Sequence, residues 1–343
     1  MNSTHDAAAV TPTPFAGLTP DVVLDALDSV GLRGDGRLLQ LNSYENRVFQ
    51  VYLEDGPVVV AKFYRPSRWS DEQILEEHQF TAELVVQEVP VVPPLALTAD
   101  PSSRLAPILC GEPATLARVH AAGSDFRFAV SPRHAGWAPP LEDPAVLERI
   151  GRFIGRMHAA GASKLFAQRP TLSVATRGWA ARDWIYQHAD LPLELVTPWK
   201  DAAGRALDLV QTAFDRHESM NVLRLHGDCH VGNILWTTEG PHFVDLDDAM
   251  NGPVVQDLWM LLSGEGGAAR ADARALLAGY EAFCEFDDHE LMLVEPLRTL
   301  RMIHYSAWLA KRWSDPAFPA AFPWFGTAAY WQEQIQLLKE RAT

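Results

Sequence analysis

The spacing of apolar residues predicts two parts of the chain that differ in secondary structure. In the first part, short apolar runs follow one another between residues 38 and 63, separated by a polar stretch at 43–46 and a Gly-containing turn at 54–56. Runs of this length joined by such turns predict three antiparallel strands. Two further strands are predicted at about 106–110 and 115–120.

Helical spacing, with apolar residues three or four positions apart, marks the other predicted elements. A short helix is predicted to begin at Thr19-Pro20, where a capping hydroxyl precedes a proline in the first helical position, and to end at Gly31. A second helix is predicted to begin at Ser70, between the third and fourth strands. Beyond Asp143 the pattern is mainly helical, and it predicts helices at 143–161, within 171–222, and at 268–283, 288–312 and 330–340.

This order of elements predicts an α+β protein with two lobes. Strands and helices up to the last predicted strand would form a small lobe over residues 15–120, built around an antiparallel sheet. The later helices would form a larger, mainly helical lobe over residues 121–343. Segment 1–14 predicts a disordered tail and not a signal peptide, because it lacks a charged region followed by an apolar one.

Composition narrows the range of partners. The chain has 343 residues and is 48% hydrophobic, enough for a sizeable core, and 29 Lys and Arg against 44 Asp and Glu give a net charge of −15. That charge argues against nucleic acid or an anionic membrane as the main partner. The 3 cysteines lack the spacing of a metal site, and no apolar run reaches the ~20 residues that span a bilayer. We therefore expect a cytoplasmic protein with reduced thiols, present as a monomer.

The stretch 223–257 concentrates polar residues at the spacing of a catalytic site. Asp228 and Asn233 lie five residues apart in a predicted loop, and Asp245 follows twelve residues after Asn233. Apolar segments on either side of the Gly-Pro dipeptide at 240–241 predict a hairpin that turns there. The hairpin would bring Asp245 back beside Asn233.

A carboxylate, an amide oxygen and a second carboxylate in this order suit transfer of a phosphate from ATP. Mg²⁺ takes oxygen ligands, usually one or two from the protein and the rest from water and phosphate, and Asn233 and Asp245 can supply them. Asp228 is then available to hold the acceptor hydroxyl and accept its proton, as the loop Asp of protein kinases does. The alternative is that Asp and Asn in such a loop bond only their own backbone. The presence of all three residues with a predicted hairpin favours the catalytic interpretation.

Lys62 ends the third predicted strand, where a lysine is costly to bury without an anionic partner. In kinases such a lysine binds the α- and β-phosphates of ATP and is held by a glutamate from a helix. The helix that begins at Ser70 offers Glu76 and Glu77, whose side chains point about 100° apart, so only one of them can face Lys62. The other interpretation of Lys62 is an edge lysine that extends into solvent.

The catalytic loop of the aminoglycoside-phosphotransferase and choline-kinase group is similar to residues 226–235, His-Gly-Asp-Cys-His-Val-Gly-Asn-Ile-Leu. The chain resembles the bacterial stress response kinase A family more closely still, from about residue 15 to about residue 338. The segments that carry this second resemblance are 41–48, 75–80, 257–262 and 313–319.

These resemblances imply a two-lobed protein-kinase-like fold and Mg²⁺-dependent transfer of the γ-phosphate of ATP to Ser or Thr hydroxyls of a protein. They imply that Ser43, in the loop between the first two strands, contacts ATP, and that Glu77 holds Lys62. They also imply that Asp257 supports the catalytic loop. The adenine is expected near backbone groups of residues 118–120.

Only twelve residues separate Asp245 from Asp257. Protein kinases fill this interval with an activation loop and an Ala-Pro-Glu motif, which carry their phosphorylation switch. Here the motif is absent and 249–253 is predicted to be a turn, so gating by a long phosphorylated loop is not expected. Asp247 and Asp248 lie beside Asp245, and one of them could add a metal ligand or a supporting bond.

Other functions are also compatible with the residues. The glycine in His-Gly-Asp, the short segment after Asp245 and acidic residues in the cleft resemble small-molecule kinases of the aminoglycoside, choline or homoserine type, which would phosphorylate a small hydroxyl compound. A nucleotide-binding regulator without turnover is disfavoured by the joint presence of Lys62, Asp228, Asn233 and Asp245. Cys229 would be a redox sensor only if its thiol were exposed and its pKa lowered.

Overall fold

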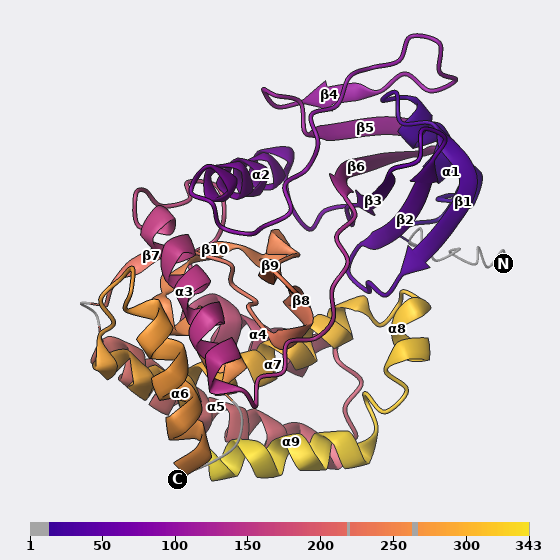
Figure 1. The fold of residues 1–343 in the computed structure, drawn as a ribbon. Coiled ribbons are helices and arrows are strands. Elements are labelled where there is room, and N and C mark those ends of the chain that lie inside the picture. Colours follow the sequence, from indigo (N-terminus) through magenta and orange to yellow (C-terminus); the bar gives the residue numbers. More distant parts are fainter. Residues whose placement is uncertain (1–13, 218–219, 263–266, 343) are drawn as a thin grey trace, which may run out of the picture.

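The computed structural model describes residues 14–217, 220–262 and 267–342, so the predicted tail 1–14 lies, apart from Pro14, outside the described residues. The described chain forms a small lobe around a sheet and a larger, mainly helical lobe (Figure 1). The predicted α+β class and two-lobed arrangement are confirmed.

The small lobe contains a six-stranded antiparallel sheet in the order β1-β2-β3-β6-β5-β4. Helix α1 packs on this sheet, because Val23 and Leu27 of α1 share a buried apolar cluster with Phe63 and Phe128 of the strands. In chain order the elements are α1 (Pro20–Asp28), β1 (Gly34–Leu41), β2 (Arg47–Leu53), β3 (Val58–Phe63), β4 (Ile108–Cys110), β5 (Leu116–Ala121) and β6 (Ser124–Pro132).

The predicted lobe boundary at residue 120 is wrong. Strand β6 lies inside the small sheet, where its Ala129 is paired with Lys62 of β3. Ala122 and Gly123 form the hairpin turn between β5 and β6, with φ values of 48° and 74°. Positive φ at both central residues is what a two-residue hairpin turn of type I′ requires. The small lobe therefore includes the whole of β6.

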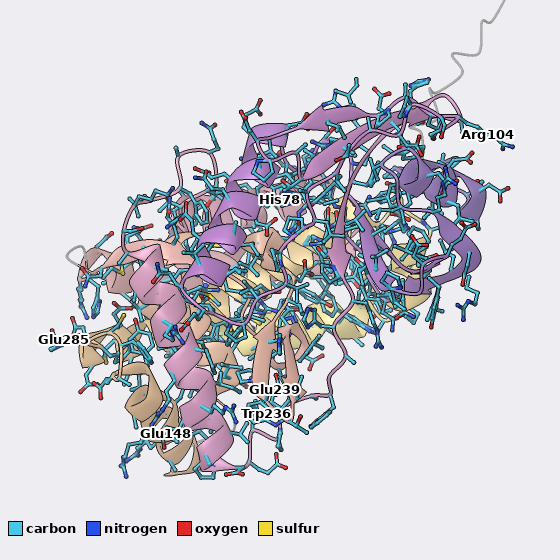
Figure 2. All side chains as sticks on the ribbon, turned by 45° about the horizontal axis from the view of Figure 1, so that its top comes forward. His78, Arg104, Glu148, Trp236, Glu239 and Glu285 are labelled. Atoms are coloured by element: carbon cyan, nitrogen blue, oxygen red, sulfur yellow. The ribbon has the colours of Figure 1, made fainter. Side chains whose placement is uncertain are left out.

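Helix α2 (Asp71–Val86) lies between the sheet and the large lobe (Figure 1). It begins with a capping box, in which the Ser70 hydroxyl accepts from the Gln73 N–H at 3.2 Å and the Gln73 side chain accepts from the Ser70 N–H at 2.9 Å. His78, labelled within the molecule in Figure 2, contacts the Tyr64 hydroxyl at 2.8 Å and the Thr115 hydroxyl at 2.9 Å. These contacts fix the helix to the sheet.

The large lobe packs its helices around two apolar clusters, one of which contains the fully buried pair Trp199 and Trp331. Within the described residues, no helix combines the length and apolar character needed to cross a bilayer. The helices are α3 (Pro144–Gly161), α4 (Ala180–His188), α5 (Leu193–Asp215), α6 (Gly267–Tyr280), α7 (Val294–Arg312), α8 (Ala317–Ala321) and α9 (Ala328–Glu340), with a π-helical turn at Ala175–Trp179.

Two small antiparallel pairs complete the large lobe: β7 (Val222–Leu225) with β10 (Met250–Pro253), and β8 (Ile234–Thr237) with β9 (Gly240–Phe243). Segment 249–253 is thus largely a strand and not the predicted turn. The predicted β8–β9 hairpin exists, but its turn is at 238–239, because Thr237 is paired with Gly240. Its tip, marked by Trp236 and Glu239 in Figure 2, lies at the edge of the molecule.

Candidate active site

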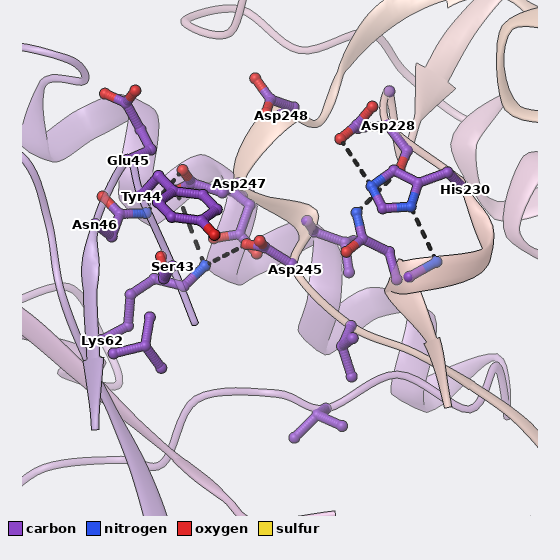
Figure 3. A pocket seen from close by; sticks show the side chains of 18 of the residues that line it. Ser43, Tyr44, Glu45, Asn46, Lys62, Asp228, His230, Asp245, Asp247 and Asp248 are labelled. Carbon is purple, nitrogen blue, oxygen red and sulfur yellow. Dashed lines mark hydrogen bonds and ion pairs between the residues drawn. The ribbon is translucent and has the colours of Figure 1, made fainter. Parts of the chain in front are cut away.

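A cavity of about 950 Å³ lies between the two lobes. Its small-lobe wall comes from the loop 41–46, β3 and α2, and its large-lobe wall from the loop 227–235, the segment 244–248 and α7. In Figure 3, Ser43, Lys62 and Asp245 lie close together, and Asp228 with His230 lies further along the same cavity. All the predicted site residues line it: Ser43, Lys62, Glu77, Asp228, Asn233 and Asp245.

The backbone before Asp228 is held by Asp257, which is fully buried. Its carboxylate accepts hydrogen bonds from the N–H groups of His226 at 2.7 Å and Gly227 at 2.8 Å, and it contacts Nε2 of His158 at 3.1 Å. Buried backbone donors need such acceptors. The support that the resemblance implied for Asp257 is therefore present in the structure.

Replacing Asp257 by Ala should destabilise the fold, because two buried N–H groups and a buried histidine would lose their acceptor together. The expected loss of unfolding free energy is about 3–5 kcal/mol. Urea denaturation of the variant would measure it, with Asp208→Ala on the exposed side of α5 as the matched control, for which a change within about 0.5 kcal/mol is expected. An Asp257→Ala midpoint equal to that of the control would contradict this assignment.

Gly227 is required by the close approach of two loops. Its φ is 84°, and a Cβ at this position would lie 2.2 Å from the carbonyl oxygen of Asp248. No larger residue fits there without moving the backbone. On the other side of the loop, Nε2 of His226 contacts the carbonyl oxygen of Val244 at 3.0 Å, next to Asp245. The two acidic segments of the site are thus fixed to each other.

Lys62 pairs with Asp245, with Nζ and Oδ1 2.7 Å apart, and its Nζ lies 4.0 Å from Oδ1 of Asp247. Burial would lower the pKa of Lys62, but the carboxylates of Asp245 and Asp247 more than offset this effect and raise the pKa above its usual value. The ammonium group is therefore charged and faces the cavity. Lys62 is not an edge lysine extended into solvent, since 23% of its side chain is exposed.

The adjacent glutamates of α2 point in different directions. Glu77 lines the cavity and accepts a hydrogen bond from the Thr81 hydroxyl at 3.0 Å. Glu76 accepts from the backbone N–H groups of residues 167–169 at 2.6 Å, 2.8 Å and 2.8 Å. No ion pair joins Glu77 to Lys62 in the described part of the chain. Glu77 is nevertheless the glutamate on the Lys62 side.

Asn233 and Asp245 offer oxygens that suit a divalent cation. The Asn233 amide group donates to the Asp228 carbonyl at 3.0 Å, which leaves its amide oxygen without a partner among the described residues. The Val244 N–H donates to the Asn233 carbonyl at 3.0 Å, so the hairpin brings Asp245 beside Asn233 as predicted. The Asp245 side chain is 52% exposed. The described residues contain no cluster of three or more metal-binding side chains, but Mg²⁺ beside phosphates needs only one or two protein ligands.

Asp247 and Asp248 are both committed to Arg68. One Arg68 nitrogen bonds Asp247, and Nη2 lies 2.8 Å from Oδ1 of Asp248. Asp247 is buried and also accepts from the Asn46 amide at 3.0 Å. These two acidic residues therefore support the cavity wall, while Asp245 is the one that remains open to a ligand.

Two basic side chains hold Asp228. Arg301 of α7 bonds Oδ1, and Nε2 of His230 lies 3.5 Å from Oδ2. Burial would raise the pKa of Asp228, but His230 and Arg301 more than offset this effect and hold that pKa well below its usual range. In the sequence, Arg301 was one of three arginines, with Arg298 and Arg312, that add positive charge to the predicted helix 288–312. Its pairing with Asp228, 73 residues away, was not predicted.

The loop that contains Ser43 is held by the large lobe. Glu45 accepts from Nη2 of Arg312 at 2.7 Å and from the Trp308 indole N–H at 2.5 Å. The Asn46 amide donates to Asp247 at 3.0 Å. The sequence analysis singled out Ser43 but not these anchors, because their partners are far away along the chain.

The expected position of the adenine is wrong, and the condition for a redox role of Cys229 is not met. Residues 118–120 lie within β5 and do not line the cavity, which is bordered instead by 131–136 at the end of β6 and the start of the linker. Cys229 is fully buried, and burial raises the pKa of its thiol well above the usual value. A redox sensor requires an accessible thiol with a lowered pKa, so Cys229 is a core residue.

Comparison with known proteins identifies the family. The sequence profile of the phosphotransferase enzyme family (APH) matches residues 37–293. Stress response kinase A of Escherichia coli (strain K12) is 44% identical over 330 residues, covering 96% of this chain and 94% of that protein. The serine/threonine protein kinase RdoA of Salmonella typhimurium is 42% identical over 327 residues, covering 95% and 93%.

Among solved structures, an amicoumacin kinase in complex with AMP-PNP and Ca²⁺ superimposes with a TM-score of 0.67 at 17% identity, covering 92% of each chain. This likeness supports the fold. The chain belongs to the phosphotransferase enzyme family and, within it, to the bacterial stress response kinase A family.

Proposed function

We propose that this phosphotransferase moves the γ-phosphate of Mg²⁺-bound ATP to a Ser or Thr hydroxyl of a protein. The observation that carries the proposal is one cavity that Lys62, Asp228, Asn233 and Asp245 line together. The names of its relatives, stress response kinase A and a serine/threonine protein kinase, support a protein acceptor.

ATP would lie along the cavity with its adenine against the backbone of 131–136 and its phosphates beneath the loop that contains Ser43. The Lys62 ammonium would bind the phosphates, for which it must exchange its bond to Asp245. Asn233 and Asp245 would hold Mg²⁺, which neutralises charge on the transferred phosphate when it is bound.

Asp228 would orient the acceptor hydroxyl and accept its proton. Its low pKa keeps the carboxylate ionised at neutral pH, so it can accept a hydrogen bond from a serine or threonine. A carboxylate of low pKa is a weak base, and phosphoryl transfer needs more positioning than proton abstraction. Its contribution would therefore come mainly from placing the hydroxyl in line with the phosphate.

Glu77 and Glu76 offer a matched pair of variants. Glu77→Gln should raise the KM for ATP about tenfold, because Lys62 needs a nearby carboxylate once Asp245 turns to the metal. Glu76→Gln should leave that KM unchanged and lower the unfolding free energy by about 1–2 kcal/mol, because it weakens three hydrogen bonds to the backbone of 167–169. Steady-state kinetics and urea denaturation separate the two effects, and an exchange of the two phenotypes would show that the assignment is reversed.

The function itself is tested with purified protein, radiolabelled Mg²⁺-ATP and two generic protein acceptors, one acidic and one basic, followed by phosphoamino-acid analysis. Label on Ser or Thr of an acceptor or of the enzyme, absent with Asp228→Ala, would support the proposal. Consumption of ATP only when small amines or sugars are supplied would replace the protein acceptor by a small molecule. Binding of ATP without any transfer would contradict the proposal.

A further inference from the structure

Beyond Asp228 the described part of the cavity wall carries basic side chains and no acidic ones. This wall is formed by segment 172–177 and by the residues of α7 from 297 to 308 that face the cavity. Within these described segments, the lining side chains include two guanidinium groups, from Arg177 and Arg301, and no carboxylate. The remaining lining side chains are aliphatic, aromatic or imidazole.

Arg177 has no carboxylate at ion-pair distance within the part of the chain that the structure describes. Its one polar contact is to the sulfur of Met250, at 3.7 Å from Nη2. Burial lowers the pKa of the Arg177 guanidinium even though Asp248 and Asp228 lie in its surroundings. The Arg177 side chain is partly exposed and lines the cavity, so its guanidinium N–H groups are available to an anion that the described residues do not supply.

Arg301 has hydrogen-bond donors to spare. Its contact with Asp228 uses Nη1, and 42% of its side chain is exposed. Guanidinium carries five N–H donors in a planar fork, so Arg301 can keep Asp228 and bind a second anion at the same time. His304, on the same helix, has its pKa lowered to about 3 by burial and by Arg177, so its ring is neutral and adds no charge.

One cavity carboxylate, Asp228, pairs with this wall through Arg301, and among the described residues no carboxylate forms an ion pair with Arg177. Asp247 and Asp248 are bound to Arg68, and Asp245 is bound to Lys62. Acidic residues in a cleft would suit a cationic substrate, but the pairing of these carboxylates gives no support for one. Asp245, Asp247 and Asp248 have cationic partners at the nucleotide end, whereas at the acceptor end Arg177 has no ion-pair partner among the described residues and Arg301 shares Asp228.

We infer that the acceptor carries an anionic group, a carboxylate or a phosphate, next to the hydroxyl that is phosphorylated, and that Arg177 and Arg301 bind this group. The inference rests on the proposed function and names its substrate class: Ser or Thr flanked by acidic or already phosphorylated residues. Guanidinium recognises both anions in the same bidentate way, so the wall alone does not distinguish them.

The test uses serine peptides of equal length that differ only at the flanking positions, which are Glu, phosphoserine, Gln or Lys. The wild-type enzyme should phosphorylate the Glu or phosphoserine peptide about 10- to 100-fold more efficiently than the Gln peptide, as expected for one charge-assisted contact. Success with both anionic peptides indicates a general anion site, and success with phosphoserine alone indicates a phosphate site. Equal efficiencies, or a preference for the Lys peptide, would overturn the inference.

Arg177→Gln should abolish this preference, because kcat/KM should fall far more for the anionic peptides than for the Gln peptide. Arg205→Gln, an exposed change on α5 of the same kind, is the control. Arg177→Lys keeps the charge and should retain part of the preference, which guards against a variant that simply misfolds. An equal loss on all peptides would assign Arg177 a structural role and contradict the inference.

A binding measurement separates this inference from the proposed function. Fluorescent versions of the peptides with Ala in place of Ser are titrated with wild-type enzyme and Arg177→Gln in the presence of Mg²⁺-ADP, and anisotropy reports binding. Selective binding of the anionic peptides without transfer to their serine versions would reject the protein-kinase function and keep the anion site. Transfer without selectivity would keep the function and reject the site, and neither binding nor transfer would reject both.

Discussion

Replacing Asp228 by Asn is expected to reduce phosphate transfer by about 10²- to 10⁴-fold, because the neutral amide holds the acceptor hydroxyl less well and does not accept its proton. The amide has nearly the same shape, and it can still contact Arg301 and His230, so the fold of the loop should survive. It cannot accept the hydroxyl proton as a carboxylate does. Binding of Mg²⁺-ATP should remain within about twofold, because the change lies at the acceptor end of the cavity.

The pH dependence of the wild-type enzyme provides a second test of Asp228. Its pKa is held below the usual value of about 3.9. Asp228 is therefore protonated only at a lower pH than a free aspartate. The titration of Asp228 should therefore cause no decrease in kcat/KM between about pH 5 and pH 8.

Single-turnover experiments measure the expected loss of phosphate transfer by Asp228→Asn. Equilibrium binding measures whether its affinity for Mg²⁺-ATP is kept. Asp208→Asn, which makes the same chemical change on the exposed side of α5, serves as the control and should behave as the wild type. If Asp228→Asn retains full transfer, the assignment of Asp228 is wrong. If it loses transfer and nucleotide binding together, the residue acts on the nucleotide or on the fold.

Local signals in the sequence predicted most of the fold. The capping hydroxyl of Thr19 accepts from the Val22 N–H at 3.3 Å at the start of α1, and the cap at Ser70 begins α2. These elements form for reasons contained in a few neighbouring residues. The lobe boundary failed because Ala122-Gly123 marks a turn equally well between two strands of one sheet or between two lobes. Only pairing of β6 with β3, far away in sequence, decides between them.

In the candidate site, too, local sequence predicted some features, and contacts between distant segments decided the others. A short-range pattern identified Asp228, Asn233 and Asp245, because the loop and hairpin that bring them together lie within one stretch. The resemblance to known kinases, and not the periodicity, favoured Glu77 over Glu76. The side chains that set the charge of the site come from other elements: Arg301 reaches Asp228 across 73 positions. Such contacts depend on how helices pack, which no local spacing encodes.

Replacing Asp245 by Asn should lower the transfer rate about 10²- to 10³-fold, equivalent to ~3–4 kcal/mol of transition-state stabilisation, because a charged oxygen ligand of Mg²⁺ is lost. Binding of metal-free ATP should change in the opposite direction and become equal or tighter. The substitution removes a negative charge facing the triphosphate and releases Lys62 from its 2.7 Å bond. This opposite sign distinguishes a metal ligand from a residue that supports the fold.

Asp247→Asn is the informative comparison. Asp247 is buried and bonded to Arg68 and Asn46, so its replacement should lower the urea midpoint, with a smaller effect on the Mg²⁺ dependence of the rate. The measurements are the transfer rate as a function of Mg²⁺ concentration, nucleotide binding with and without metal, and urea denaturation of both variants. If only Asp247→Asn weakened the dependence of the transfer rate on Mg²⁺, Asp247 would be the metal ligand and Asp245 the residue that supports the fold. Asp245 is favoured as the ligand because its carboxylate is half exposed to the cavity, whereas that of Asp247 already has its partners inside the protein.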